Sequence, residues 1–363
     1  MNYNKICEVF DHKGTLKEAG PYGCGHINST YCLTVENNGE TKRYIVQRIN
    51  NSIFKDVYGL MNNVLLVTNH IRKKNEGTVD YDRCTLTVIP TVDGKLCYDD
   101  GEGNFYRTYL FVEGTVALQA VENPEQLETL GAAFGDFQNQ LADFDASKLV
   151  ETIPNFHNTE DRYRLFEEAV ANNIAGRADS VKAEIEFVRE RKADASKLLN
   201  LLKEGKLPLR VTHNDTKLNN ILFDEKDLHA VCVIDLDTVM PGLVHYDFGD
   251  SIRFGASTGA EDEKDLSKIE MSLELFEMYT KGFLSTCKDK LNDEEINNLP
   301  FSAKLLTFEC GMRFLTDYLN GDTYFKIHRP EHNLDRCRTQ FKLVYDMETK
   351  MDAMIEIVNK YRA

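Results

Sequence analysis

The sequence predicts an α+β protein with two lobes, a smaller strand-rich lobe over residues 1–114 and a larger, mainly helical lobe over residues 115–363. Two observations carry this prediction. Before residue 114, runs of β-branched and aromatic residues alternate with glycine-containing turns. After residue 123, apolar residues recur at helical spacing through long stretches. Because the strands come first and the helices second, the chain fits the α+β class.

The strands of the first lobe are predicted from turn signals and apolar runs. Segment 20–31 contains a glycine-punctuated turn that runs into an alternating strand, and Asn38-Gly39 after it is a strong hairpin signal. A glycine-rich turn between strands lets backbone amides approach phosphate closely. The other elements expected here are a return strand at 43–49, a helix within 54–75, and strands at 84–91 and 106–112.

The helices of the second lobe begin at a clear capping signal. Asn123 is followed by Pro124 at the first helical position and by Gln126 three residues after the cap, so a helix is expected to run to about Leu141. Further helical patterns cover 160–203, 267–286, 301–319 and 334–361.

Composition limits the partners of the chain. The formal net charge is −16 over 363 residues, which argues against nucleic acid or an anionic membrane as the main partner. The nine cysteines are odd in number and form no CxxC pair, which fits a reducing cytoplasm better than disulfides or a zinc site. With no signal-peptide layout and no apolar run of roughly 20 residues, we expect a cytoplasmic protein.

The chemistry is concentrated in residues 210–237. His213-Asn214-Asp215 is followed by Asn220, and an apolar run then ends in Asp235-Leu236-Asp237. Phosphoryl transfer needs an aligned nucleophile and compensation of phosphate charge, and little covalent help from the protein. Asp215 fits the carboxylate that faces the acceptor hydroxyl. Asn220 and Asp235 offer the oxygen ligands that magnesium prefers, and a hairpin between them would bring the two together.

At these residues the chain resembles the aminoglycoside phosphotransferase and choline kinase branch of the protein-kinase-like superfamily, and within it the bacterial N-acetylhexosamine 1-kinases. The resemblance covers nearly the whole chain, and its specific part is the block 210–253. The motifs that carry it are HNDTKLNNIL, IDLDTVMPG, YDFGDSIR and a GPYGxGHIN-type start. It implies a bilobal protein-kinase-like fold, with a nucleotide-binding first lobe, a catalytic and sugar-binding second lobe, ATP as co-substrate and Mg²⁺ as cofactor.

The resemblance also implies roles for individual residues. Contacts to the sugar would come from His26, Asn28, Lys217, Arg313 and Tyr324. Contacts to the nucleotide would come from Gly23, Gly25, Ser29, Thr30, Gln47, Phe111 and Glu113, the last two at a hinge that binds the adenine edge. Plainer alternatives stay open: Lys217 as a solvated loop charge, Tyr324 as a packed aromatic, and Arg313 as part of a surface ion pair.

Three residues are interpreted as structural. His213 is expected to brace the catalytic loop, and Asp237 to orient Asp235 more than to bind metal itself. Asp247-Phe248-Gly249 spells the tripeptide that carries a magnesium ligand in protein kinases, but it lies far beyond Asp235. The family pattern puts the ligand at the Asp235 position, so Asp247 is expected to cap the catalytic loop.

One position departs from the superfamily. Most members carry a lysine at the end of the strand after the glycine loop, where it pairs with nucleotide phosphates, whereas this chain has Gln47 with Arg48 beside it. A neutral amide cannot supply that charge. Which residue replaces the lysine is left open by the sequence, and Arg48 can equally be a surface charge.

The function expected from these features is ATP- and Mg²⁺-dependent phosphorylation of the anomeric hydroxyl of N-acetylhexosamines. An alternative is a kinase of another small acceptor, such as choline, an aminoglycoside or another sugar. A cationic acceptor calls for aromatic cages or acidic pockets, whereas this chain has no tryptophan and places Lys217 and Arg313 at the expected pocket. A third hypothesis, suggested by Gln47, is a nucleotide-binding protein without catalysis.

Overall fold

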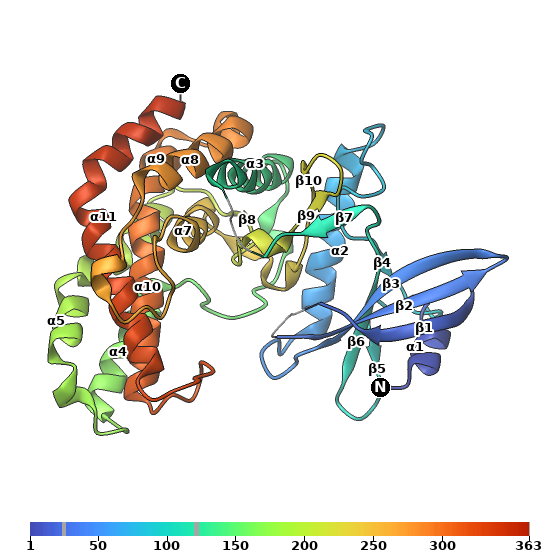
Figure 1. Ribbon diagram of the computed structural model, residues 1–363, viewed down its shortest axis with the longest axis horizontal. Helices are drawn as coiled ribbons and strands as arrows, with labels where there is room; N and C mark the ends of the chain where they lie inside the picture. The colour runs from blue at the N-terminus through green and yellow to red at the C-terminus, as the bar shows by residue number, and fades with distance from the viewer. Residues whose placement is uncertain (24–26, 120–122, 363) are drawn as a thin grey trace. The chain divides into compact units, whose positions relative to one another are not determined.

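The structure is a computed structural model that describes residues 1–23, 27–119 and 123–362. It confirms the α+β class, with an antiparallel sheet in the N-terminal part and helices in the C-terminal part (Figure 1). The chain forms two compact units. The first comprises Met1–Leu118, Asp143–Pro154 and Asn219–Pro241, and the second comprises Gln119–Ala142, Asn155–Leu218 and Gly242–Ala363. The predicted boundary after residue 114 stays a prediction.

The first unit is built on a six-stranded sheet in the order β1-β2-β3-β6-β4, with β5 also paired to β6. Its strands are antiparallel neighbours: β1 Thr15–Pro21, β2 Ser29–Asn37, β3 Glu40–Ile49, β4 Val88–Ile89, β5 Tyr98–Asp99 and β6 Phe105–Leu110. Asn38 and Gly39 both have positive φ, at 54° and 87°, as a two-residue hairpin requires, so this predicted turn is confirmed.

Helices and a small second sheet complete the first unit. Helix α1 covers Tyr3–Val9 and α2 covers Val57–Lys74, whose first turn is capped by the Asp56 carboxylate. The predicted apolar face of α2 is buried: Val57, Leu60, Val64 and Val67 are at most 2% exposed. The second sheet has the order β10-β9-β7, formed by β7 Thr115–Ala117, β9 Ile221–Asp224 and β10 Ala230–Val233.

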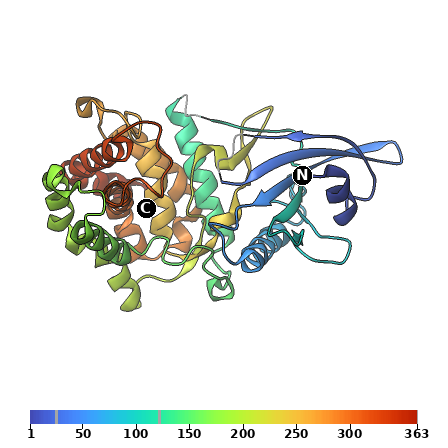
Figure 2. The same ribbon diagram turned by 90° about the horizontal axis from the view of Figure 1, so that it is seen from below.

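The second unit is mainly helical. Its helices are α3 Pro124–Gln140, α4 Thr159–Asn172, α5 Lys182–Glu190, α6 Lys197–Lys203, α7 Val244–Gly255, α8 Leu273–Cys287, α9 Asp293–Asn297, α10 Leu299–Leu319 and α11 His332–Arg362. Strand β8 is Arg210–Thr212, and β11, Met240–Gly242, spans the point where the chain passes between units. Helix α10 lies beside α11, and α3 beside α8 (Figures 1 and 2).

The α3–α8 contact depends on small residues. A side chain at Gly131 would meet the backbone oxygen of Tyr279 at 2.3 Å, and one at Gly282 would meet the backbone oxygen of Glu128 at 1.9 Å. The helices can approach this closely only because these positions lack a Cβ. The predicted cap of α3 is confirmed, since the Asn123 side chain accepts a hydrogen bond from the Gln126 backbone N–H at 3.1 Å.

Three sequence predictions differ from the observed elements. Strand β1 was not predicted, and only its last two residues, Gly20 and Pro21, fall where the turn was expected; both are tolerated on a sheet edge. The strand predicted at 84–91 shrinks to β4, Val88–Ile89. The helical stretch predicted at 160–203 is divided into α4, α5 and α6, and Asn173 ends α4 in the left-handed conformation.

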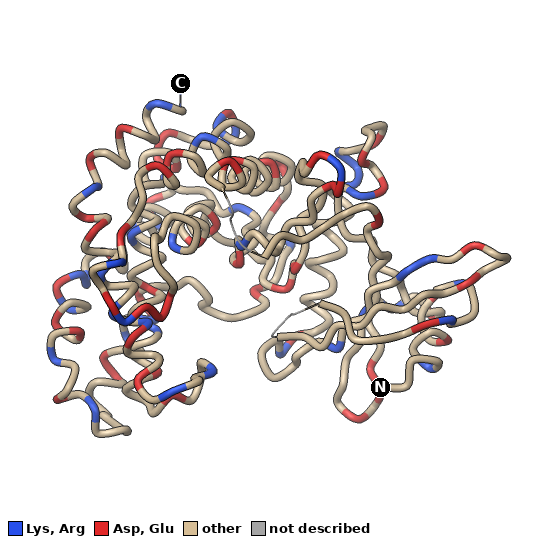
Figure 3. The backbone as a smooth tube through the Cα atoms, viewed as in Figure 1, with Lys and Arg blue, Asp and Glu red and all other residues tan. Residues whose placement is uncertain are grey.

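Charged residues of both signs are spread over the helices of the second unit. Acidic and basic positions are interspersed along α4, α5 and α11 (Figure 3). In the part of the chain that the structure describes, every cysteine is a free thiol. Among the same residues, none of the helices combines the length and apolar character needed to cross a bilayer.

His245 makes the stability of the second unit sensitive to acid. The ring is fully buried, its Nε2–H donates to the Glu295 carbonyl at 3.0 Å, and its Nδ1 has no hydrogen-bond partner in the described structure. Burial lowers the pKa of His245 from its ordinary 6.5 to about 4. Stability from the neutral ring is therefore complete above the unfolded-state value and is lost as the pH falls toward 4.

We expect this histidine to lower the free energy of unfolding by about 2 kcal/mol between pH 7 and pH 5. Urea denaturation at the two pH values measures the loss. His245→Gln, which can still donate to the Glu295 carbonyl, should remove about that much of the pH dependence. His328→Gln, at an exposed position, should keep it. An unchanged pH dependence in His245→Gln would contradict the assignment.

Candidate functional site

A buried carboxylate holds the predicted catalytic loop in the second unit. Asp247, in the first turn of α7, accepts hydrogen bonds from the backbone N–H groups of His213 at 2.9 and 3.0 Å and of Asn214 at 2.8 Å. The Gln138 amide on α3 donates to the same carboxylate at 2.8 Å. Burial raises the pKa of Asp247, and these donors oppose the rise. Its oxygens are thus directed at the loop backbone.

His213 lies within the same support. Its ring is fully buried and packs edge-on against Phe134 and Phe137, with ring centroids at 5.5 and 5.9 Å. Its Nδ1 accepts a hydrogen bond from the Asp215 backbone N–H at 3.3 Å. These contacts make His213 a brace that turns the chain toward Asp215.

Asp215 follows the segment braced by His213 and lies beside a lysine. Asn214, just before it, has a left-handed φ of 65°, so the backbone changes direction at this residue. The Asp215 carboxylate lies 2.5 Å from the Lys217 ammonium group, and its side chain is 27% exposed. Burial lowers the pKa of Lys217, but the charges of Asp215 and Asp250 outweigh it, so the pKa is raised. The lysine is therefore a cation beside the predicted base.

A second ion pair lies on α7. The buried Arg253 donates to Asp250 from Nε and Nη2 at 3.0 and 2.9 Å, and to Glu261 from Nη1 at 2.9 Å. Burial raises the pKa of Asp250, but the charges of Arg253 and Lys217 outweigh this and lower it. Asp250 is thus a carboxylate shared electrostatically between two cations.

Arg313 and Tyr324, both expected at the sugar, belong to one aromatic cluster of the second unit. The Arg313 guanidinium carbon lies 5.6, 5.9 and 5.5 Å from the ring centroids of Phe156, Tyr324 and Phe325. Tyr324 is 66% exposed, which does not fit a packed aromatic. The cluster therefore presents a cation and an accessible phenol together.

The loop that carries Tyr324 is held by another buried carboxylate. Asp317, near the end of α10, accepts from the backbone N–H groups of Thr323, Tyr324 and Phe325 at 2.8 to 2.9 Å. The Asn333 amide on α11 also donates to it, at 2.8 Å. Sequence reasoning missed this role, although an aspartate six residues before a polar turn was visible.

The first unit holds the two predicted metal ligands at the end of the β9–β10 ladder. The Ile234 backbone N–H donates to the Asn220 carbonyl at 2.9 Å, which continues the pairing of Ile221 with Val233. Asn220 is buried and Asp235 is exposed, with a left-handed φ of 58°. The hairpin predicted between the two residues is thus present, and it brings their backbones side by side.

Asp237, two residues after Asp235 in the chain, is buried. One of its oxygens accepts from Arg107 Nη1 and the other from Asn28 Nδ2 at 2.6 Å. The Asn28 Oδ1 in turn accepts from the Asn50 backbone N–H at 2.9 Å. Both polar ends of Asn28 are thus engaged within the first unit, and its expected contact with a sugar stays a prediction.

The side-chain amide of Gln47 is hydrogen-bonded at both its oxygen and its nitrogen. Its Oε1 accepts from Arg107 at 2.9 and 2.7 Å, and its Nε2 donates to the Thr30 hydroxyl at 3.1 Å. Arg48 is on the same strand and contacts Asn104 at an exposed position. Arg107 was missed by sequence reasoning because a lone arginine in a strand carries no local signal.

The remaining nucleotide positions are partly described. Gly23 has a positive φ of 73°, and Ser29 and Thr30 begin β2. The Phe111 backbone N–H already donates to the Arg43 carbonyl at 3.0 Å, and the Glu113 carboxylate pairs with the Arg43 guanidinium. Gly25 and His26 lie outside the described residues.

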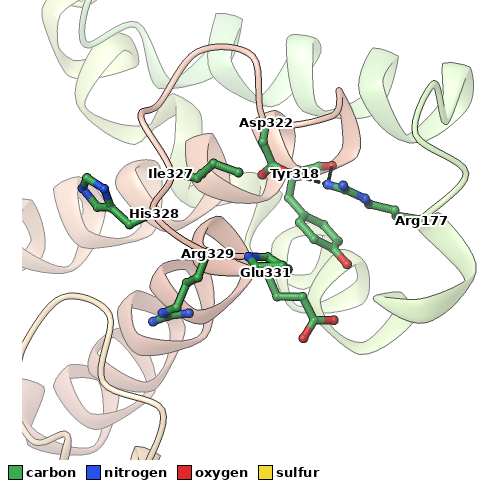
Figure 4. Close-up of a pocket in the computed structure, with 8 residues that line it drawn as sticks. Arg177, Tyr318, Asp322, Ile327, His328, Arg329 and Glu331 are labelled. Atoms are coloured by element: carbon green, nitrogen blue, oxygen red, sulfur yellow. Dashed lines mark hydrogen bonds and ion pairs between the residues drawn. The ribbon is translucent and has the colours of Figure 1, made fainter.

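A separate hollow lies in the second unit beside the loop that follows α10. It has a volume of about 620 Å³ and is lined by Arg177, Tyr318, Asp322, Ile327, His328, Arg329, Pro330 and Glu331 (Figure 4). Its arginines are paired: Arg177 binds Asp322 at 2.6 Å, and Arg329 binds Asp262 and Asp335. None of the predicted site residues lines this hollow.

Solved structures share this fold. An aminoglycoside phosphotransferase from Alicyclobacillus acidocaldarius matches with a TM-score of 0.59 and 13% identity, over 98% of this chain and 95% of that one. A microcompartment-associated aminopropanol kinase matches with a TM-score of 0.55 and 15% identity, over 97% of both chains. A spectinomycin phosphotransferase solved with ADP and spectinomycin matches with a TM-score of 0.53 and 13% identity, over 98% and 96%.

These similarities confirm the protein-kinase-like fold predicted from the sequence. A family model described as the phosphotransferase enzyme family, APH, matches residues 21–268, which include β2, β3 and the whole block from Arg210 to Arg253. The chain belongs to this phosphotransferase family.

Proposed function

We propose that this phosphotransferase-family protein is an ATP- and magnesium-dependent kinase that phosphorylates the anomeric hydroxyl of N-acetylhexosamines to give the sugar 1-phosphate. The observation that carries the acceptor class is the 2.5 Å ion pair between Asp215 and Lys217. The positive charge of Lys217, beside the carboxylate proposed to bind the hydroxyl, would repel an acceptor that carries an ammonium group. A neutral polyol instead gains a hydrogen-bond donor there.

Arg313 supports the same acceptor class. Its guanidinium lies near three aromatic rings, so the aromatic groups that could hold a cationic acceptor already surround a cation. The names of the similar structures favour the alternative, because aminopropanol and aminoglycosides are amines. Those structures are only 13 to 15% identical to this chain, so the local charges carry more weight.

The first unit offers donors that suit magnesium. The Asp235 carboxylate is exposed at a strand end, and the adjacent Asn220 contributes an amide oxygen, both hard oxygen ligands of the kind that magnesium selects. When bound there, magnesium would neutralise charge on the nucleotide phosphates. The turn after β10 is anchored, because Asp237 accepts hydrogen bonds from Asn28 and Arg107.

In the second unit, Asp215 orients the acceptor hydroxyl and accepts its proton late, because a loose phosphoryl-transfer transition state develops little charge on the nucleophile. Lys217 donates to a sugar oxygen beside Asp215. Asp247 holds the loop backbone from which both project. The donors in the Arg313 cluster bind sugar hydroxyls away from the reacting atom.

Asp215→Asn should lower turnover by about a hundredfold or more, because the amide keeps the shape but is a poor proton acceptor and misplaces the hydroxyl. Nucleotide affinity should change by less than about twofold, since the proposed metal ligands are other residues. Steady-state ADP release measures the first quantity and calorimetry with ADP the second. Asp289→Asn, at an exposed position of the same unit, is the matched control. Full activity in Asp215→Asn would remove it from the mechanism.

Asp235 and Asp247 should behave in opposite ways when changed to asparagine. Asp235→Asn should abolish turnover with an unchanged melting temperature, because it removes a ligand charge from an exposed position. Asp247→Asn should lower the free energy of unfolding by about 1–3 kcal/mol, because an amide NH₂ would face backbone N–H groups, and should leave the magnesium requirement unchanged. The reverse pattern would make Asp247 the metal ligand.

Arg313→Gln should raise the Michaelis constant for the sugar by about tenfold while that for ATP stays within about twofold, because a donor to the sugar is lost. Arg191→Gln, another arginine stacked on a ring, is the control.

Wild-type protein should release ADP with N-acetylhexosamines, and phosphorus–proton coupling in NMR should locate the phosphate on carbon 1. Phosphate on another carbon, or consumption of choline or an aminoglycoside instead, would overturn the sugar assignment. Absence of ADP release with every acceptor tested would favour the non-catalytic hypothesis.

A further inference from the structure

A chain of buried side-chain hydrogen bonds connects four segments of the first unit. Gln47 on β3 and Arg107 on β6 face each other across the antiparallel ladder. The Arg107 Nε and Nη2 groups both donate to Gln47 Oε1, at 2.9 and 2.7 Å. The strand position where most of the superfamily carries a lysine is thus occupied by a neutral amide bound to a cation from the neighbouring strand.

Arg107 continues the chain toward the turn after β10. Its Nη1 donates to Asp237, whose second oxygen accepts from Asn28 at the start of the segment leading into β2. The arginine side chain is 1% exposed and that of Asp237 4%, so both charges are removed from water. Burial lowers the pKa of Arg107, but the charge of Asp237 and its hydrogen bond to the guanidinium outweigh this, so the pKa is raised.

Stability alone is a weak explanation for this pair. Burying two charges costs about as much as their attraction returns, and apolar replacements of buried ion pairs are often neutral or stabilising. The pair has a clear geometric effect, however. Asp237 lies in the single 3₁₀ turn Leu236–Thr238, and Asp235 begins that turn in a strained left-handed conformation. Holding Asp237 from two sides fixes the backbone that presents the Asp235 carboxylate.

We propose that Arg107 is a positioning residue for the metal–nucleotide site. Arg107 holds Asp237 and thereby sets the direction of Asp235. The hydrogen bond from Asn28 to Asp237 ties the same turn to the start of β2. The positive charge that position 47 lacks is thus supplied by Arg107 on β6. Arg107 holds a metal ligand in place and does not contact phosphate, because its guanidinium is enclosed and bound on three nitrogens. The inference rests on the proposed function in one respect, which is that Asp235 binds magnesium.

The test measures ADP binding to the full chain by calorimetry, with and without Mg²⁺ and in the absence of any acceptor. Changing Arg107 alone would leave Asp237 buried and unpaired, so the main variant removes both charges, Arg107→Gln with Asp237→Asn. Magnesium should strengthen ADP binding to the wild type, and this strengthening should fall by about tenfold or more in the double variant, as is typical for residues that orient a metal ligand.

Two further variants separate charge from geometry. Arg107→Lys keeps the charge but loses the planar fork that reaches Gln47 and Asp237 together, so it should give an intermediate loss. Arg48→Gln removes an exposed arginine next to Gln47 and should leave ADP binding within about twofold of wild type. Thermal unfolding of each variant shows that the fold is retained.

The outcomes are distinguishable. If magnesium strengthens ADP binding as much in the double variant as in the wild type, the positioning role of Arg107 is wrong. It is also wrong if the double variant loses affinity equally with and without Mg²⁺. If the wild type itself binds ADP no better with Mg²⁺, the proposed metal site fails, and the inference fails with it.

Discussion

Buried carboxylates must have their oxygens satisfied by donors, and this constraint organises the loops of both units. Asp247 accepts from the backbone of the Asp215 loop, Asp317 from the loop that carries Tyr324, and Asp237 from Arg107 and Asn28. In each case, a charge removed from water can be stable only if distant segments bring donors to it. The position of each loop is thereby set by electrostatics as much as by apolar packing.

The residues expected to act on substrate stand next to these anchors and not within them. Asp215 follows the left-handed Asn214, and Asp235 is itself left-handed, a conformation that costs non-glycine residues about 1 kcal/mol or more. The neighbouring anchors hold the chain in this shape, which leaves Asp235 exposed and Asp215 partly exposed. The unfavourable backbone conformations at Asn214 and Asp235 are thus retained at the positions that present these two carboxylates.

Around the proposed acceptor site, the local charges differ in sign from the net charge of the chain. Lys217 lies beside Asp215, and Asp250 is flanked electrostatically by Lys217 and Arg253. The formal net charge of −16 would suggest attraction of cations, yet the carboxylates of this region already have partners. Long-range charge is weakened by salt within about 10 Å, so the near cations decide what an acceptor meets.

The sequence alone determined the features that depend on neighbours in the chain. The apolar period of α2, the Asn38-Gly39 turn, the Asn123 cap and the hairpin between Asn220 and Asp235 follow from spacing and backbone preference, and all are present. The edge strand β1 was not predicted, because it pairs only with β2 and its residues carry no alternating apolar pattern. Only the tertiary structure decided that Arg107 supplies the cation bound to Gln47. Arg107 and Asp237 are separated by 130 positions, and no local pattern records which distant charge a buried carboxylate will meet.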